Sequence, residues 1–417
     1  MNLPVLSLVA FAAALLVSCF TPINVGFLSI ALAFVVGAGF GGLKVTEIIA
    51  GFPVSLFLIL TGVTLLFSQA SVNGTLDQVT RRSVRLARGN LGMIPVIFFF
   101  LAASLASIGA GNIATTALLA PVAMAVAGKV GISAFLMTVM VASGANAGAF
   151  SPIAPTGVIA NSLMARVGIT GVEWATYGNN LLAQSLVAFA GYFALGGLAL
   201  FRRGRAAAVD EFLAAQAEAF GWKQKLTLTL IAALIVGVVF WRLDVGMGAF
   251  IAASILALTR ASDEEAAVKA MPWNTILMVS GVTVLIAILE KTGGMDLFTS
   301  LLARLSTPTT VTAVMAFFVG LVSVYSSSSG VVLPAFLPTV PGLIAKMGGG
   351  DALAIASSIN VGAHLVDVSP LSTLGALCIA AAPATEDRNA LFRKLLLWGL
   401  SMSVVGAGVC YVLFGLL

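Results

Sequence analysis

The chain alternates long apolar runs with short polar connections, and the lengths of those runs predict helices that cross a membrane. About 20 apolar residues span a bilayer as a helix. Apolar spans are expected at 4–21, 23–43, 53–72, 176–201, 225–242, 245–258, 272–290 and 393–416. Two amphipathic pieces, 73–91 and 294–306, lie between them. The pattern therefore predicts an all-α polytopic membrane protein.

Two further apolar runs are too long for one crossing and have small polar residues at their centres. The first run covers 92–127 with its polar centre at 111–113, and the second covers 308–345 with its centre at 328–330. Irregular backbone at mid-membrane is tolerated only where protein or a water-filled cavity covers it. Each run is therefore predicted to form a helical hairpin that enters and leaves on one side. We expect each hairpin tip to form part of a binding site.

Two more helices are interrupted by clusters of Gly, Pro and hydroxyl residues. The segment 132–166 is expected to break from Ser143 to Gly157, and the segment 351–383 from Gly362 to Gly375. A broken helix presents free N–H groups, which bind anions, and free C=O groups, which bind cations, without placing a full charge in hydrocarbon. No Lys or Arg lies in the core of these segments. A bound anion would therefore be held by dipoles and hydroxyls.

The order of these elements repeats along the chain at offsets of 217 to 219 residues. Three pairs of matches share this spacing: Gly62-Val63-Thr64 with Gly281-Val282-Thr283, Pro121 with Pro338, and Ser151-Pro152 with Ser369-Pro370. Each half contains five crossings, and an odd number inverts the second half. The chain is therefore predicted to be an inverted repeat, the architecture of many secondary transporters.

The distribution of basic residues predicts the orientation. With the N-terminus outside, fifteen Lys and Arg residues fall in cytoplasmic segments and six fall outside. This asymmetry follows the positive-inside rule. Both termini are then external, and the expected location is a bacterial-type inner membrane.

The composition excludes several other classes of protein. With 60% hydrophobic and 9% charged residues, the chain is not a water-soluble globule. Its net charge of +5 comes from short loops, so no nucleic-acid partner is expected. Three cysteines without CxxC spacing and a single histidine provide no zinc site and no catalytic set. We expect no enzymatic activity and no organic cofactor.

Two hairpin motifs and one broken helix resemble a known family of transporters. GNIATTALLAP (111–121) and SSSGVVLPAFLP (327–338) resemble the hairpin motifs of the divalent anion/sodium symporters in the ion-transporter superfamily. SGANAGAFSPIAPTGV (143–158) resembles the malonate-carrier (MatC) type of dicarboxylate carrier. The resemblance spans both repeats. The family pattern Ser-Asn-Thr is replaced by Gly111-Asn112-Ile113 in the first tip and by Ser328-Ser329-Gly330 in the second.

The resemblance implies an elevator transporter, usually a homodimer, that moves a small dicarboxylate such as malonate or succinate with sodium as the coupling ion. Residues 1–91 and 225–307 would form the static scaffold and dimer surface of the two repeats. The moving elements would be 92–201 and 308–417, each with a hairpin, a broken helix (132–166 or 351–383) and a last helix (176–201 or 393–416). The segment 202–224 would join the halves as a cytoplasmic surface helix.

The site residues are expected at the tips and breaks. The predicted substrate contacts are Gly111, Asn112, Ile113, Thr156, Ser328, Ser329, Gly330, Ser372 and Thr373. The predicted sodium contacts are Asn112, Ser143, Asn146, Gly148, Ser328, Gly362 and Asp367.

His364 and Asp367 leave an alternative open. Ionisable groups inside a membrane are costly and are usually functional. The two residues could carry a proton in place of sodium, or they could form a mutually satisfied polar pair that stiffens the break. A proton-coupled dicarboxylate transporter and a cation/proton antiporter of the same superfamily therefore remain alternatives. A membrane-embedded enzyme and an anion channel are less favoured.

Overall fold

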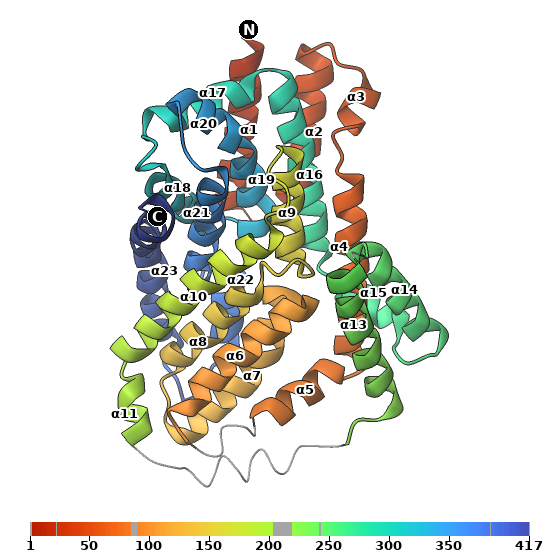
Figure 1. Ribbon diagram of the computed structural model, residues 1–417, viewed down its shortest axis with the longest axis vertical. Coiled ribbons are helices and arrows are strands. Elements are labelled where there is room, and N and C mark those ends of the chain that lie inside the picture. The colour runs from red at the N-terminus through yellow and green to blue at the C-terminus, as the bar shows by residue number, and fades with distance from the viewer. Residues whose placement is uncertain are drawn as a thin grey trace.

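The computed structural model describes residues 2–21, 23–84, 90–202, 219–241, 243–383 and 385–416 (Figure 1). Its regular elements are helices. Most of the predicted linker, including Val209, Phe212 and Leu213, lies outside the described residues.

The first half contains eleven described α-helices. Their bounds are α1 Leu3–Phe20, α2 Val25–Phe34, α3 Val45–Ile49, α4 Val54–Val72, α5 Thr75–Val84, α6 Met93–Leu105, α7 Gly111–Val130, α8 Ala134–Gly148, α9 Pro155–Arg166, α10 Glu173–Ala194 and α11 Gly197–Arg202. Two π-helical turns, η1 Val35–Phe40 and η3 Ala106–Ala110, extend α2 and α6. The predicted span 176–201 is divided because the chain turns at Gly196, whose φ is +89°.

The second half follows a similar order. Its α-helices are α13 Trp222–Trp241, α14 Val245–Leu258, α15 Glu264–Ala270, α16 Trp273–Lys291, α17 Gly294–Arg304, α18 Val311–Ser323, α19 Leu333–Phe336, α20 Val340–Met347, α21 Ala352–Leu365, α22 Thr373–Ala380 and α23 Arg388–Cys410. Short π or 3-10 turns are η4 Ser328–Val332, η5 Leu337–Thr339, η6 Val366–Val368 and η7 Tyr411–Gly415.

Six helical segments in the described part of the chain are long and apolar enough to cross a membrane. They are Val54–Val72, Met93–Val130, Trp273–Lys291, Ser328–Met347, Ala352–Ala380 and Arg388–Gly415. Shorter apolar helices include α8, which packs against α6 and α7, and α14, which packs against α4. The structure is thus a helical, multi-pass membrane protein. The count of ten crossings stays a prediction.

The two hairpins occupy different parts of the molecule. Figure 1 shows α6 and α7 beside α8 in the lower part, and α18 and α20 near α21 in the upper part. The most extensive packing between the two halves lies outside the hairpins: α2 packs against α16, and α4 packs against α14. Each half therefore contributes one helix to each of these two pairs.

Glycine makes the two pairs possible. A Cβ atom on Gly281 of α16 would meet the backbone of Gly26 in α2. A Cβ atom on Gly62 of α4 would meet the carbonyl oxygen of Gly246 in α14. Such contacts bring two backbones together with no side chain between them, as is common where membrane helices associate. The same type of contact recurs about 219 residues later, which supports the predicted duplication.

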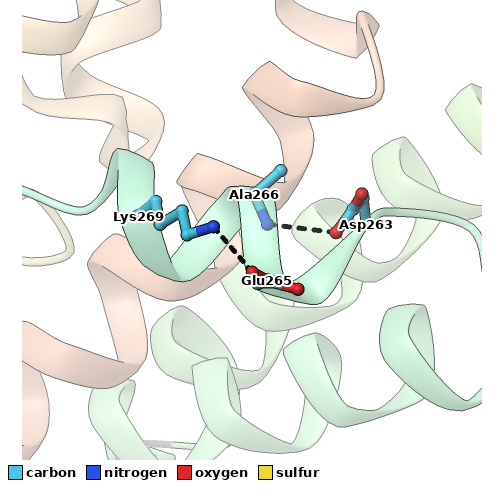
Figure 2. A network of polar contacts seen from close by, with 4 residues as sticks. All are labelled: Asp263, Glu265, Ala266 and Lys269. Atoms are coloured by element: carbon cyan, nitrogen blue, oxygen red, sulfur yellow. Dashed lines mark hydrogen bonds and ion pairs between the residues drawn. The ribbon is translucent and has the colours of Figure 1, made fainter.

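A short helix fixes the connection between α14 and α16. Asp263 caps α15 by accepting from the Ala266 N–H at 3.0 Å, and Lys269 pairs with Glu265 at 2.6 Å (Figure 2). Both partners of the ion pair are exposed, so the Asp263 cap contributes more to the stability of the helix than the ion pair does. The helix holds the loop that precedes Trp273, where α16 begins.

We predict that Gly281→Ala destabilises the protein. The added methyl group has no space against Gly26, and overpacking costs about 1–3 kcal/mol. The melting temperature of the purified protein in detergent should fall. Gly408→Ala in α23 is the matched control, because a Cβ atom there meets nothing within 4 Å. Equal melting temperatures for the two variants would contradict this account of the α2–α16 contact.

Candidate functional site

The first hairpin turns at two glycines. Gly109 has a φ of +118° and Gly111 a φ of +74°, backbone conformations that other residues rarely adopt. Side chains would also find no room, because a Cβ on Gly109 would meet the Phe67 ring. Asn112 follows in the first turn of α7 and is 7% exposed. The turn therefore places this amide at the tip, inside the protein.

The second hairpin turns between the end of α18 and the start of η4. The Ser327 hydroxyl accepts from the Gly330 N–H at 3.1 Å and caps the new helical turn. Ser328 is the first residue of that turn and is buried. The turn thus ends at Ser327, one residue before the predicted tip at 328–330. Residues 328–330 are already helical.

Both helix breaks are narrower than predicted. The first covers only the residues between Gly148 and Pro155, and the second only those between Leu365 and Thr373, including η6. The predicted cation contacts Ser143, Asn146, Gly148 and Gly362 are therefore helical, not unwound. The predicted breaks are too long because these glycines allow two helices to pack closely and do not unwind the helix. A Cβ on Gly144 would meet the Phe99 backbone, and one on Gly362 would meet the Ala316 backbone.

A chain of amide groups connects the first tip to both broken helices. Asn112 Nδ2 donates to Asn146 Oδ1 at 2.8 Å, and Asn146 Nδ2 donates to the His364 carbonyl oxygen at 2.8 Å. Asn180 Nδ2 of α10 donates to the Asn146 carbonyl oxygen, also at 2.8 Å. Three elements of the first half and one of the second meet here. Asn180 was missed, although a buried amide in an apolar helix could have indicated it.

The second tip is joined to the second break through oxygen atoms. Ser328 Oγ donates to Asp367 Oδ1 at 2.6 Å, and Ser372 Oγ lies 3.3 Å from the same oxygen. Ser323 Oγ and Ser328 Oγ both lie near the Ala363 carbonyl oxygen. Ser323 and Ala363 were not predicted. The sequence could have indicated Ser323, because it is a serine on the last turn of an apolar helix, five residues before Ser328.

His364 and Asp367 do not form the pair that was considered. His364 Nδ1 bonds to the Asn360 carbonyl oxygen at 3.0 Å, while Asp367 bonds to the serines. His364 Nε2 is buried and has no hydrogen-bond partner among the described residues. The ring packs edge-on against Phe150, with centroids 4.7 Å apart. The mutually satisfied pair is therefore wrong, because each group bonds within its own surroundings.

A cavity of about 210 Å³ lies where the tips and the second break meet. Predicted site residues on its wall are Asn112, Ile113, Ser328, Ser329, His364, Asp367, Ser372 and Thr373. The first turns of α7, η4, α16 and α22 all contribute. The described residues that line it include no Lys or Arg. Helix N-termini, hydroxyls and amides therefore provide the groups that can hold an anion.

Residues from the α1–α2 connection and from α16 close part of this cavity. Thr21, Ile23, Asn274 and Thr275 line it from the α1–α2 connection and the start of α16. Asn24 Nδ2 donates to the Asn274 carbonyl oxygen at 2.9 Å and to its Oδ1 at 2.7 Å. These two hydrogen bonds hold the α1–α2 connection against the start of α16, beside the cavity.

A second, more apolar cavity of about 460 Å³ adjoins the first tip. Asn112, Ile113, Thr275 and Ser329 line both cavities. The predicted contacts Gly111 and Thr156 line the second one only. Gly330, Ser143, Asn146, Gly148 and Gly362 line neither cavity. The structure thus gathers most predicted substrate residues around one point and leaves several predicted cation residues inside helices.

Comparison with known proteins finds one family model that matches the first part of the chain. Residues 1–149 match the family model of the dicarboxylate carrier protein MatC N-terminus. The resemblance to MatC-type carriers is therefore confirmed over those residues. No curated protein matched the chain.

Two solved structures share the fold over 98% of both chains, each with a TM-score of 0.58. One is the YdaH transporter of Alcanivorax borkumensis, at 16% identity. The other is MtrF of Neisseria gonorrhoeae, described among antimetabolite efflux pumps, at 12% identity. At these identities the likeness shows the fold alone. The family match and the shared fold support a multi-pass membrane transporter, since the matched family and the similar structures are transporters rather than enzymes.

Asn112→Ala is expected to abolish uptake of the substrate while the protein still inserts and purifies. The change removes the amide at the tip and leaves the buried Asn146 Oδ1 without its donor, at a cost of about 1–3 kcal/mol. Uptake of labelled malonate into proteoliposomes and the yield of monodisperse protein would be measured. Asn179→Ala is the matched control, because Asn179 on α10 donates to Ser357 Oγ and lines neither cavity. Unchanged uptake by Asn112→Ala would remove the tip from the site.

Proposed function

We propose that the protein is a secondary active transporter that imports a small dicarboxylate of the malonate or succinate class together with a cation, sodium in the first instance. The observation that carries the proposal is the cavity of about 210 Å³ at the meeting point of both tips. A cavity of this size has room for a C3–C5 dicarboxylate. The family match over residues 1–149 supports the same substrate class.

The wall of the cavity suits reversible binding of such an anion. Uncapped backbone N–H groups at helix N-termini favour carboxylates. Ser372, the residue before α22, directs its hydroxyl to Asp367 and makes no side-chain cap to its own helix. The N-terminus of α22 is thus left for a ligand. Neutral donors bind more weakly than a bidentate arginine would, which allows release on the other side.

The arrangement of the helices supports an elevator mechanism. The pairs α2–α16 and α4–α14 join the two halves through backbone contacts and would form the static part. The helices α6, α7, α8, α10, α18, α21 and α23 pack mainly with one another and would move together, while η4, α19 and α20 of the second hairpin also contact α16 and α17. We further propose a homodimer in a bacterial inner membrane with both termini outside, as the loop charges predict.

Proton coupling is the second candidate. His364 lines the cavity, its Nε2 has no hydrogen-bond partner in the described part of the chain, and Asp367 lies on the same wall. An imidazole titrates near pH 6.5 in water and can carry a proton with the substrate. Sodium is preferred because the oxygen atoms around Ser328 match its ligand chemistry.

Uptake assays in proteoliposomes test the proposal. Labelled malonate and succinate should accumulate under an inward sodium gradient and should not accumulate in sodium-free buffer at any pH. His364→Gln should retain concentrative transport. Ser358→Ala serves as control, because the Ser358 hydroxyl bonds to its own helix at Ala354. Accumulation driven by a pH gradient without sodium, and lost in His364→Gln, would favour the proton-coupled candidate. No uptake of either acid would contradict the proposed substrate class.

A further inference from the structure

The imidazole ring of His364 lies at the wall of the cavity with one nitrogen atom unused. His364 is fully buried near the end of α21 and is one of the residues that line the cavity of about 210 Å³. Its Nδ1 atom lies 3.0 Å from the Asn360 carbonyl oxygen, one helical turn earlier. Its Nε2 atom has no hydrogen-bond partner in the described part of the chain. Buried polar atoms are rarely left without a partner, so Nε2 requires an explanation.

The contact with Asn360 determines which nitrogen carries the proton. A carbonyl oxygen only accepts, so Nδ1 is the donor in this contact. No acidic group among the described residues bonds to the ring, and an imidazolium there would be a buried, unpaired charge. In the neutral ring with Nδ1 protonated, Nε2 is an acceptor. The Asn360 side-chain amide does not donate to it, because that amide is also buried without a partner.

The residue at the equivalent position of the first half has no such unused atom. With the offset of 218 in the predicted duplication, His364 corresponds to Asn146. Asn146 Oδ1 accepts from Asn112, and Asn146 Nδ2 donates to the His364 carbonyl oxygen. Both groups of this amide are therefore used within the protein, whereas His364 keeps an acceptor beside the cavity.

A second acceptor lies on the same wall. Asp367 lines the cavity, and its Oδ1 accepts from the hydroxyls of Ser328 and Ser372. An ionised carboxylate offers no proton, and away from water it repels a second negative charge strongly. A ligand carboxylate beside His364 would leave Nε2 without a donor, whereas a ligand O–H or N–H group would supply one. This part of the wall therefore favours a neutral group that can donate.

The helix N-termini have the opposite preference. The cavity is lined by Asn112 and Ile113 of α7, Asn274 and Thr275 of α16, and Thr373 of α22, all in the first turns of their helices. Free N–H groups at helix N-termini favour a carboxylate. The wall thus combines groups that favour one ionised carboxyl group with an acceptor that favours a neutral donor.

We infer that His364 Nε2 accepts a hydrogen bond from the substrate, so that the cavity binds a dicarboxylate with one carboxyl group ionised and the other protonated in preference to the dianion. The inference rests on the proposed function for the substrate class. His364 is then a binding residue that distinguishes a protonated carboxyl group from a carboxylate. It differs from a proton carrier, because the proton stays on the substrate.

Two singly charged relatives of malonate test the inference, because only one of them can donate. Malonate monoamide and malonate monomethyl ester each carry one carboxylate, but the amide has N–H groups and the ester has only acceptors. Isothermal titration calorimetry with the purified protein, in sodium-containing buffer at neutral pH, measures both affinities. The monoamide should bind at least about tenfold more tightly, because the ester leaves Nε2 without a donor.

Variants at His364 show whether this preference comes from the ring nitrogen. His364→Phe keeps an aromatic ring against Phe150 and removes the acceptor, so it should bind the two relatives with equal affinity. His364→Gln can both accept and donate, so it should bind both and reduce the preference for the monoamide. Ser358→Ala is the control on α21 and should keep the full preference, because Ser358 lines neither cavity.

Three results would overturn the inference: equal affinities for the amide and the ester in the unmodified protein, tighter binding of the ester, or a preference for the amide that persists in His364→Phe. If His364→Phe does not purify, an undiminished preference in His364→Gln would contradict the role of His364 equally. A preference for the monoamide without any uptake of malonate or succinate would reject the proposed function alone. If neither malonate nor either relative binds, both the proposed function and the inference are wrong.

Discussion

Helix ends buried inside the protein are the constraint on which the rest of the structure depends. The last carbonyl groups of a helix have no partner within it, and no water is present in the apolar core to supply one. Near the ends of α8 and α21, side chains from other elements meet this need: Asn180 for the Asn146 carbonyl, Asn146 for that of His364, and two serines for that of Ala363. The polar residues that complete these ends are the same ones that form the site. Stability and binding therefore share their residues.

Glycine has two different roles in this arrangement. Gly109 and Gly111 adopt positive φ and turn the chain at the first tip. Gly144, Gly281 and Gly362 remain helical and let two backbones approach. The second role explains how α8 lies against α6, and α21 against α18, closely enough to bring each tip to its break.

The sequence predicted the helices and the two tips well, because apolar length and a polar centre both carry a direct physical meaning. It failed on the extent of the breaks, since a packing glycine such as Gly362 looks the same as an unwinding one. It also missed Ser323, Ala363 and Asn180. Their importance comes from hydrogen bonds between elements, and no spacing within one helix indicates which carbonyl a distant side chain reaches. The separate surroundings of His364 and Asp367, three residues apart, have the same origin.

The charges at the cavity limit what a single cation can do. Asp367 lies on the cavity wall, and the described residues that line the cavity include no Lys or Arg, so helix N-termini and hydroxyls are the groups that face the substrate's charge. A dianion imported with one cation carries one net negative charge inward. An inside-negative potential opposes that movement by about 2.3 kcal/mol per charge for each 100 mV. The singly protonated acid with one cation carries no net charge and avoids this opposition. Under the proposed function, import with a single cation therefore favours the monoanion of the dicarboxylate as the species transported.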